Sequence, residues 1–222
     1  MPRRTWSCET WRRSFSSRSS FVPIRARMGT ATVNRRMATS QRRKRSRTPR
    51  VGRPGPTTRR PPADRFVADR SELWRTWLEA HLWIERPGGD GWWHISPRPD
   101  GVVGEWPLAT PVYLLTAYNP RGEDLPLEEN EKRLEELAAY LQKELVAAVR
   151  SLGASEDGSW MEPGFALLDV AEAQALAIAR RFEQAAIYAW RAERLEVVGA
   201  LDEGRTSVGW SLDEEPRGPA SD

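Results

Sequence analysis

Apolar and polar residues alternate in the first ordered stretch of the chain. Over residues 78–84 every second residue is aliphatic, which is the period of a half-buried strand. Residues 87–91, Pro-Gly-Gly-Asp-Gly, tolerate the positive φ angles of a tight turn, and an apolar run at 92–95 follows. The pattern predicts a β-hairpin, with a short helix over residues 69–77 before it.

The middle of the chain predicts one buried strand and one long helix. Residues 112–118 form a continuous apolar, β-prone run that stops at Asn119-Pro120, as a strand covered on both faces would. Residues 128–152 carry an apolar residue every three or four positions, which predicts one amphipathic helix ending at Gly153. The apolar stripe consists of Leu134, Leu137, Leu141, Leu145, Val149 and Leu152.

The C-terminal third predicts a strand, a helix and a closing hairpin. Residues 160–169 read as a strand interrupted by Pro-Gly. Asp-Val-Ala-Glu at the start of residues 169–183 has the spacing of a capping box, which opens a second helix. Residues 185–190 and 195–199 are β-prone runs joined by a short polar turn.

The order of predicted elements is therefore β-β-β-α-β-α-β-β. Two helices with apolar stripes need a sheet against which to bury them. We expect an α+β fold in two layers, with a mixed β-sheet of about six strands and both main helices on one face. The pattern leaves the order of the strands within the sheet open.

Charge divides the chain into a basic and an acidic part. Residues 1–62 hold 18 Arg or Lys and one acidic residue, whereas the remainder holds 16 basic and 30 acidic residues. Apolar residues are scattered through 1–62, so this segment cannot bury enough apolar area to offset its backbone entropy. We expect a disordered Arg-rich arm at 1–62, a single domain at 63–203 and a disordered acidic tail at 204–222.

Three interpretations of the arm stay open. An Arg-rich arm binds nucleic-acid phosphates by releasing counterions. Residues 1–37 also have the Arg- and Ser-rich, acid-poor composition of an organellar transit peptide. In the third interpretation, Met28 or Met37 is the true start of the protein. The residues before it are then translated upstream DNA, whose GC-rich codons give Arg, Pro, Ser and Thr. The densest basic patch, which is the candidate nucleic-acid contact, is Arg42, Arg43, Lys44, Arg45 and Arg47.

Common signatures of membrane proteins and enzymes are absent from the sequence. It has no apolar run long enough to span a membrane and no secretory h-region. It also lacks a P-loop, a Rossmann glycine motif, a nucleophile elbow and a zincin motif. The single cysteine, Cys8, lies in the arm, which excludes a disulfide or a thiolate zinc site in the body. We expect a cytoplasmic protein without a cofactor or a membrane contact.

The two histidines, His81 and His94, approach each other if the first hairpin forms. Two imidazoles and a carboxylate such as Glu79 could then bind a metal ion. Two half-exposed histidines on a sheet are the simpler interpretation, and we expect no metal site.

A set of polar and aromatic residues lies at the predicted strand and helix ends. Asn119 leaves its strand before a proline, which holds it extended, and Trp160 and Glu162 share one side of a strand. The set offers donors, acceptors and a stacking face, but no nucleophile. Alternatively, the asparagines cap a turn and a helix, Trp160 fills the core, and Glu162 pairs with Arg181. The candidate ligand-binding residues are Thr116, Asn119, Asn130, Trp160, Glu162, Arg181 and Gln184.

Four motifs in this order resemble domain-of-unknown-function family 3293, a group of small bacterial proteins. They are Thr116-Ala117-Tyr118-Asn119-Pro120, Asn130, Trp160-Met161-Glu162 and Phe182-Glu183-Gln184-Ala185. The resemblance covers about residues 75–199. Glu183 stands where the family is expected to have a glycine, which questions a tight backbone turn there. The family has no assigned activity, so the resemblance implies an established domain and favours a functional role for the polar set.

Three functions follow from these observations. The first is a non-enzymatic intracellular domain that binds a small polar ligand or a partner protein through the Asn, Glu, Gln and Trp residues. The second is association with nucleic acid through the arm. The third is a hydrolase or transferase that uses Glu162 as its base.

Overall fold

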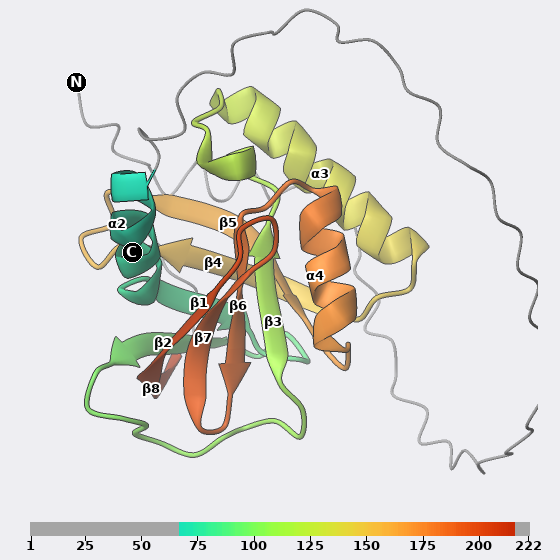
Figure 1. Ribbon diagram of the computed structural model, residues 1–222. Coiled ribbons are helices and arrows are strands. Elements are labelled where there is room, and N and C mark those ends of the chain that lie inside the picture. The colour runs from blue at the N-terminus through green and yellow to red at the C-terminus, as the bar shows by residue number, and fades with distance from the viewer. Residues whose placement is uncertain (1–66, 216–222) are drawn as a thin grey trace, which may run out of the picture.

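Eight strands and three α-helices make up residues 67–215, the part of the chain that the computed structural model describes (Figure 1). The strands are β1 (His81–Glu85), β2 (Trp92–Arg98), β3 (Val112–Thr116), β4 (Ala148–Ala154), β5 (Met161–Leu167), β6 (Ala186–Arg191), β7 (Arg194–Gly199) and β8 (Arg205–Glu215). The helices are α2 (Val67–Leu78), α3 (Leu127–Lys143) and α4 (Glu172–Arg181), with a 3-10 turn η2 (Pro120–Gly122). The basic arm lies outside the described residues, as does its patch of Arg42, Arg43, Lys44, Arg45 and Arg47.

The strands close into a barrel in which every strand pairs with two neighbours. The order around the barrel is β1-β2-β8-β7-β6-β3-β5-β4, and β4 pairs back onto β1. All of these pairs are antiparallel. The expected two-layer α+β fold, with a mixed sheet of about six strands, is therefore wrong. Closure leaves no strand edge unpaired, and an unpaired edge is a liability in β-proteins.

Strand β4 occupies sequence that the apolar stripe assigns to the end of a long helix. Helix α3 ends at Lys143, and Leu145 adopts φ +54° with 77% of its surface exposed. The Leu145 amide donates to the carbonyl of Gln142, and the Val146 amide donates to that of Leu141, which is the Schellman pattern of a helix end. Glycine usually fills the left-handed position of this motif. A leucine there hides the end of the helix from a reading of the sequence.

Strand β8 occupies sequence that composition assigns to a disordered tail. Thr206, Val208, Trp210 and Leu212 alternate with Ser and Gly residues, which is the period of a half-buried strand. The acidic residues that follow obscure this pattern. Strand β8 joins β2 to β7, and β4 joins β1 to β5. The β1–β2 hairpin pairs with the rest of the barrel only through β4 and β8. A prediction that omits these two strands therefore gives an open sheet.

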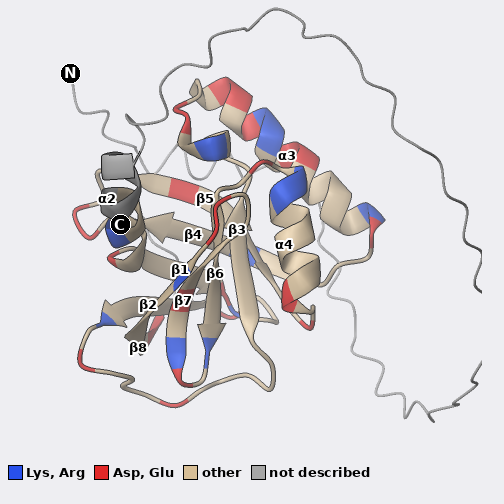
Figure 2. Cartoon of the chain, in the orientation of Figure 1, with Lys and Arg blue, Asp and Glu red and all other residues tan. Residues whose placement is uncertain are grey.

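Two apolar clusters lie on opposite sides of the strands. Val112 and Leu114 of β3 join the cluster inside the barrel, whereas Tyr113 and Leu115 join the cluster that includes α3 and α4. This division follows the alternation of side chains along a strand. Charged residues lie along α3 and near strand ends, while most of the strand surface is uncharged (Figure 2). None of the described helices is long and apolar enough to cross a membrane.

The capping box expected at the start of the second helix does not form. Helix α4 begins at Glu172 after Ala171, and no side chain caps it. Asp169 adopts φ +54° and accepts a hydrogen bond from the hydroxyl of Thr110 at 2.9 Å. The Glu172 carboxylate instead accepts a hydrogen bond from Arg191 of β6 at 2.6 Å. Glu172 therefore ties the start of α4 to the barrel.

Four tryptophans fill one end of the barrel interior. The ring centroid of Trp190 lies 4.6 Å from that of Trp106, 5.5 Å from that of Trp210 and 5.9 Å from that of Trp93. Trp190 and Trp210 are fully buried, and the Trp210 indole N–H donates to the carbonyl of Arg191 at 2.8 Å. Aromatic side chains in tilted and edge-to-face contact bury large apolar areas. Side chains therefore fill the inward positions of β6 and β8 at this end of the barrel.

Trp210 of β8 is fully buried in the barrel, so a substitution there tests whether β8 closes the barrel. We expect Trp210→Ala to lower the free energy of unfolding by about 3–5 kcal/mol, because the substitution empties a fully buried site. Urea unfolding followed by far-ultraviolet circular dichroism measures this loss. Ser207→Ala, at an exposed position of the same strand, is the control and should change stability by less than about 0.5 kcal/mol. A loss below about 1 kcal/mol for Trp210→Ala would contradict the closure of the barrel through β8.

Candidate functional site

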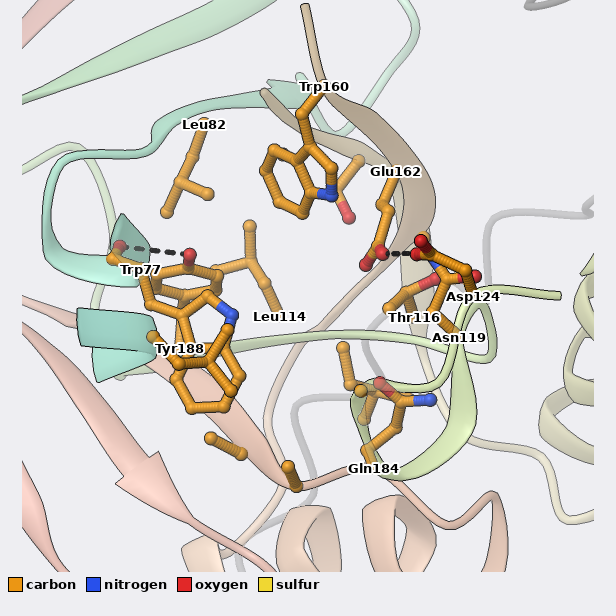
Figure 3. Close-up of a pocket in the computed structure, with 18 residues that line it drawn as sticks. Trp77, Leu82, Leu114, Thr116, Asn119, Asp124, Trp160, Glu162, Gln184 and Tyr188 are labelled. Atoms are coloured by element: carbon orange, nitrogen blue, oxygen red, sulfur yellow. Dashed lines mark hydrogen bonds between the residues drawn. The ribbon is translucent and has the colours of Figure 1, made fainter. Parts of the chain in front are cut away.

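A cavity of about 190 Å³ lies in the barrel, at the end opposite Trp93, Trp190 and Trp210, and Figure 3 shows the residues that line it. Alternation along the strands sends Trp160, Glu162 and Gly164 toward it from β5 and the residue before β5. Strand β6 contributes Ala186 and Tyr188 in the same way. The remaining lining residues are Leu73, Trp77, Leu82, Leu114, Leu115, Thr116, Asn119, Gly122, Asp124, Ser151, Gly153, Gln184 and Ala185. The walls are largely apolar, with a few polar groups that converge on the space.

Glu162 is the central polar group of the cavity. The Nδ2 of Asn119 donates a hydrogen bond to its Oε1 at 2.7 Å. Burial raises the pKa of Glu162 to about 7. Hydrogen bonds from the side chains of Asn119 and Trp160 oppose this shift, and the nearby charge of Asp124 adds to it. Glu162 is half-buried, and its carboxyl group sits at the wall of the cavity beside Asn119 and Asp124 (Figure 3).

Asn119 and Asn130 form a reciprocal pair that fixes the loop beside Glu162. Asn130 Oδ1 accepts the backbone N–H of Asn119 at 2.8 Å, and Asn130 Nδ2 donates to Asn119 Oδ1 at 2.9 Å. The Asn119 Oδ1 also accepts the backbone N–H of Leu125 at 3.1 Å. With its oxygen occupied in this way, the Asn119 amide can turn only its nitrogen toward Glu162. Asn130 is buried in α3 and does not line the cavity, so its role is to position Asn119.

The backbone at Asn119 differs from the expectation that the following proline holds it extended. Asn119 adopts φ 47° and ψ 59°, in the left-handed region. Asparagine is one of the few residues that enter this region readily, and the hydrogen bonds to Asn130 and Leu125 hold it there. The turn directs the Asn119 side chain back over β5 instead of onward along the strand.

Gln184 reaches the cavity from the turn after α4. Glu183 adopts φ 59°, its amide donates to the carbonyl of Arg180, and the Gln184 amide donates to that of Ala179. This is a second Schellman motif. The tight turn is therefore present although Glu183 stands where a glycine was expected. The Nε2 of Gln184 donates to the carbonyl of Tyr118 at 2.9 Å, which leaves its Oε1 on the cavity side (Figure 3).

Of the other three predicted residues, two line the cavity, Thr116 and Trp160, and Arg181 does not. The Thr116 hydroxyl donates to the carbonyl of Pro163 at 2.7 Å and accepts from the amide of Tyr118, so it joins β3 to β5 at the wall. Trp160 lines the space with its ring, as its shared side of the strand with Glu162 predicts. Arg181 is exposed at the end of α4 and stacks over the ring of Tyr140 at 4.8 Å. The structure does not bring it to Glu162.

The lining residues that sequence reasoning missed include Trp77, Asp124 and Tyr188. The Tyr188 hydroxyl donates to the backbone carbonyl of Trp77 at 2.9 Å, which ties α2 to β6 at the edge of the cavity. Burial raises the pKa of Tyr188 above its usual range, and the Glu162 charge adds to the shift, so Tyr188 is a neutral phenol. The sequence could have identified Tyr188, because it lies two residues from Trp190 on β6 and therefore on the same face of the strand. No sequence pattern placed Trp77 or Asp124 beside the strands.

His81 and His94 meet on the outer face of the first hairpin. His81 Nδ1 lies 3.0 Å from His94 Nε2, so one nitrogen donates to the other, and Trp83 stacks on His94 with 4.3 Å between ring centroids. Burial lowers the pKa of His94, the carboxylate of Glu215 at 3.4 Å opposes this shift, and His81 adds to it. Glu79 is exposed before β1. Within residues 67–215, no three His, Cys, Asp or Glu side chains form a group placed to hold a metal ion.

A family match covers the polar part of this site. Residues 115–187 match the family model described as "Protein of unknown function (DUF3293)". The match covers 73 of the 222 residues, so this part of the chain is similar to the family. The DUF3293 segment contains all four motifs that carry the resemblance, and it is shorter than the expected span of about 75–199. No curated protein and no solved structure matches the chain, and the DUF3293 description assigns no activity.

The buried carboxyl group predicts a pH-dependent cost in stability. The pKa of Glu162 rises from 4.5 to about 7 on folding, so its favourable contribution is complete below pH 4.5 and is lost as the pH rises through 7. We expect Glu162→Gln to be more stable than the wild type at pH 8 by about 1–3 kcal/mol, and similar to it at pH 4.5. Urea unfolding between pH 4.5 and 8 measures the difference.

Glu136→Gln is the control for this experiment, because Glu136 is an exposed residue of α3 outside the cavity. Its stability relative to the wild type should stay constant over the same pH range. An equal pH dependence for wild type and Glu162→Gln would show that Glu162 ionises in the folded protein as it does in the unfolded chain.

Proposed function

We propose that this domain binds a small polar ligand in the barrel cavity, with Glu162 as the principal hydrogen-bonding group. The observation that carries the proposal is the fixed orientation of Glu162 within a mostly apolar space. Asn119 holds its carboxyl group, and Asn130 holds Asn119. A carboxyl group whose burial raises its pKa to about 7 costs stability, and such costs concentrate at functional sites.

The volume of the cavity favours a small molecule over a partner protein. An apolar protein cavity of about 150 Å³ accommodates benzene, so a cavity of about 190 Å³ has room for a ring and a short substituent. Ligand sites of this kind combine apolar walls with a few placed polar groups. Leu82, Leu114 and Trp160 supply the walls, and Glu162 and Gln184 supply polar groups on different sides (Figure 3).

A fragment library screened by ligand-observed NMR against the full chain tests this proposal. We expect hits whose affinity falls at least tenfold in Glu162→Gln, because that substitution changes the polar centre while keeping its shape. Asn119→Ala should weaken the same hits by freeing the carboxyl group. Arg181→Ala is the matched control, since Arg181 lies outside the cavity, and it should leave the affinities unchanged.

Thermal melts of the same variants separate binding from stability. If Glu162→Gln and Asn119→Ala change only the melting temperature, and every fragment binds them as it binds the wild type, these residues are structural. The proposal is then wrong. The same holds if no fragment binds the wild type.

A second candidate function is a hydrolase or transferase in which Glu162 transfers a proton. The observation that favours it is a carboxyl group with a pKa of about 7 beside an open space, because general acid–base groups work best near the ambient pH. Panels of hydrolase and transferase substrates, assayed with wild type and Glu162→Gln, test it. We expect turnover to fall by about 10²–10⁴-fold in the variant. Equal rates for the two proteins would exclude this role.

A further inference from the structure

We propose that the ligand of the cavity is a small organic cation, of the class of a protonated primary amine attached to an apolar group. This inference rests on the proposed function and adds the chemical class of the ligand. It depends on three features of the cavity: which hydrogen-bonding groups remain free, which charges line it, and what its walls are made of.

Most hydrogen-bond donors around the cavity are already used within the protein. The Tyr188 hydroxyl donates to the carbonyl of Trp77, and the Thr116 hydroxyl donates to that of Pro163. The Trp160 side chain hydrogen-bonds to Glu162. Among side chains, the hydroxyl of Ser151 can still donate or accept, and the indole N–H of Trp77 can still donate (Figure 3).

The groups that remain for a ligand are mainly acceptors. The Nε2 of Gln184 donates to the carbonyl of Tyr118 at 2.9 Å, and its Oε1 faces the cavity (Figure 3). The carboxylates of Glu162 and Asp124 accept hydrogen bonds and cannot donate when ionised. A ligand that satisfies these oxygens has to carry several N–H or O–H groups, and an ammonium group carries three.

The charge of the cavity favours the same ligand. Two carboxylates, those of Glu162 and Asp124, line one side, and the Asp124 charge disfavours ionisation of Glu162. No Lys, Arg or His is among the residues that line this space in the described part of the chain. A cation bound between the two carboxylates would relieve their repulsion, whereas an anion would increase it.

The walls suit the apolar part of such a molecule. Trp77, Trp160 and Tyr188 bring three aromatic rings to the space. The face of an aromatic ring attracts a cation, and indole does so more strongly than the other rings. Leu82 and Leu114 close the inner side toward the packed end of the barrel. The cavity therefore offers a charged rim for an ammonium group and an apolar interior for its substituent.

Benzylamine, benzyl alcohol and benzoate are the probes, because they share a ring and differ in charge. Isothermal titration calorimetry on the full chain should show benzylamine binding at least tenfold more tightly than either of the others at pH 8. Its apparent affinity should fall about tenfold between pH 8 and pH 6, because only the ionised form of Glu162 binds the cation and its pKa is about 7. Glu162→Gln should remove both the preference and the pH dependence, while Arg181→Ala keeps them.

Proton release gives an independent readout of the same event. At pH 7, titrations in two buffers of different ionisation enthalpy should show release of about half a proton on benzylamine binding. Tighter binding of benzyl alcohol or benzoate than of benzylamine overturns the inference and leaves the proposed binding function intact. If other library fragments bind but none of these three probes does, the inference is likewise overturned and the proposed binding function stands. If no fragment binds at all, the proposed function and the inference both fail.

Discussion

The size of the side chains inside the barrel determines where this protein has a site. An interior ringed by eight strands is only just wide enough for side chains to fill it. At one end Trp93, Trp190 and Trp210 fill it. At the other end the inward positions of β4, β5 and β6 hold small residues: Ser151, Gly153, Gly164 and Ala186. A Cβ on Gly164 would lie 2.4 Å from the carbonyl oxygen of Leu115, so close strand pairing as well as open space depends on that glycine.

The two amide side chains of the cavity, those of Asn119 and Gln184, come from outside the regular strand pattern, and each depends on a left-handed residue. Asn119, at φ 47°, turns the chain so that its side chain meets Glu162, and Glu183, at φ 59°, places Gln184 on the cavity side of α4. Neither position has a glycine, so both conformations depend on hydrogen bonds, from Asn130 in the first case and within the helix end in the second. The cavity is therefore preorganised by backbone turns that α3 and α4 hold in place.

The sequence predicts the individual strands better than the way they join. The alternation along residues 78–84 places Leu82 and Ile84 inside, and the same period places Trp160 and Glu162 on one side of β5. Leu145 hides the end of α3 and with it β4, because the left-handed turn there lacks the expected glycine. The acidic end of β8 hides the alternation around Trp210. Because the prediction lacks β4 and β8, it gives an open sheet where the structure has a closed barrel. Elsewhere the alternation of apolar and polar residues identifies the strands correctly.

The segment that matches the family supplies the polar groups of the cavity, whereas sequence outside it supplies part of the wall. The DUF3293 segment, residues 115–187, supplies Asn119, Glu162 and Gln184. Trp77, Leu82 and Tyr188 lie outside it. The segment thus holds the groups that orient a charge, and the flanking sequence holds part of the wall that admits or rejects an apolar substituent. The Tyr188 hydroxyl donates to the backbone carbonyl of Trp77, so this contact between α2 and β6 does not require a particular side chain at position 77.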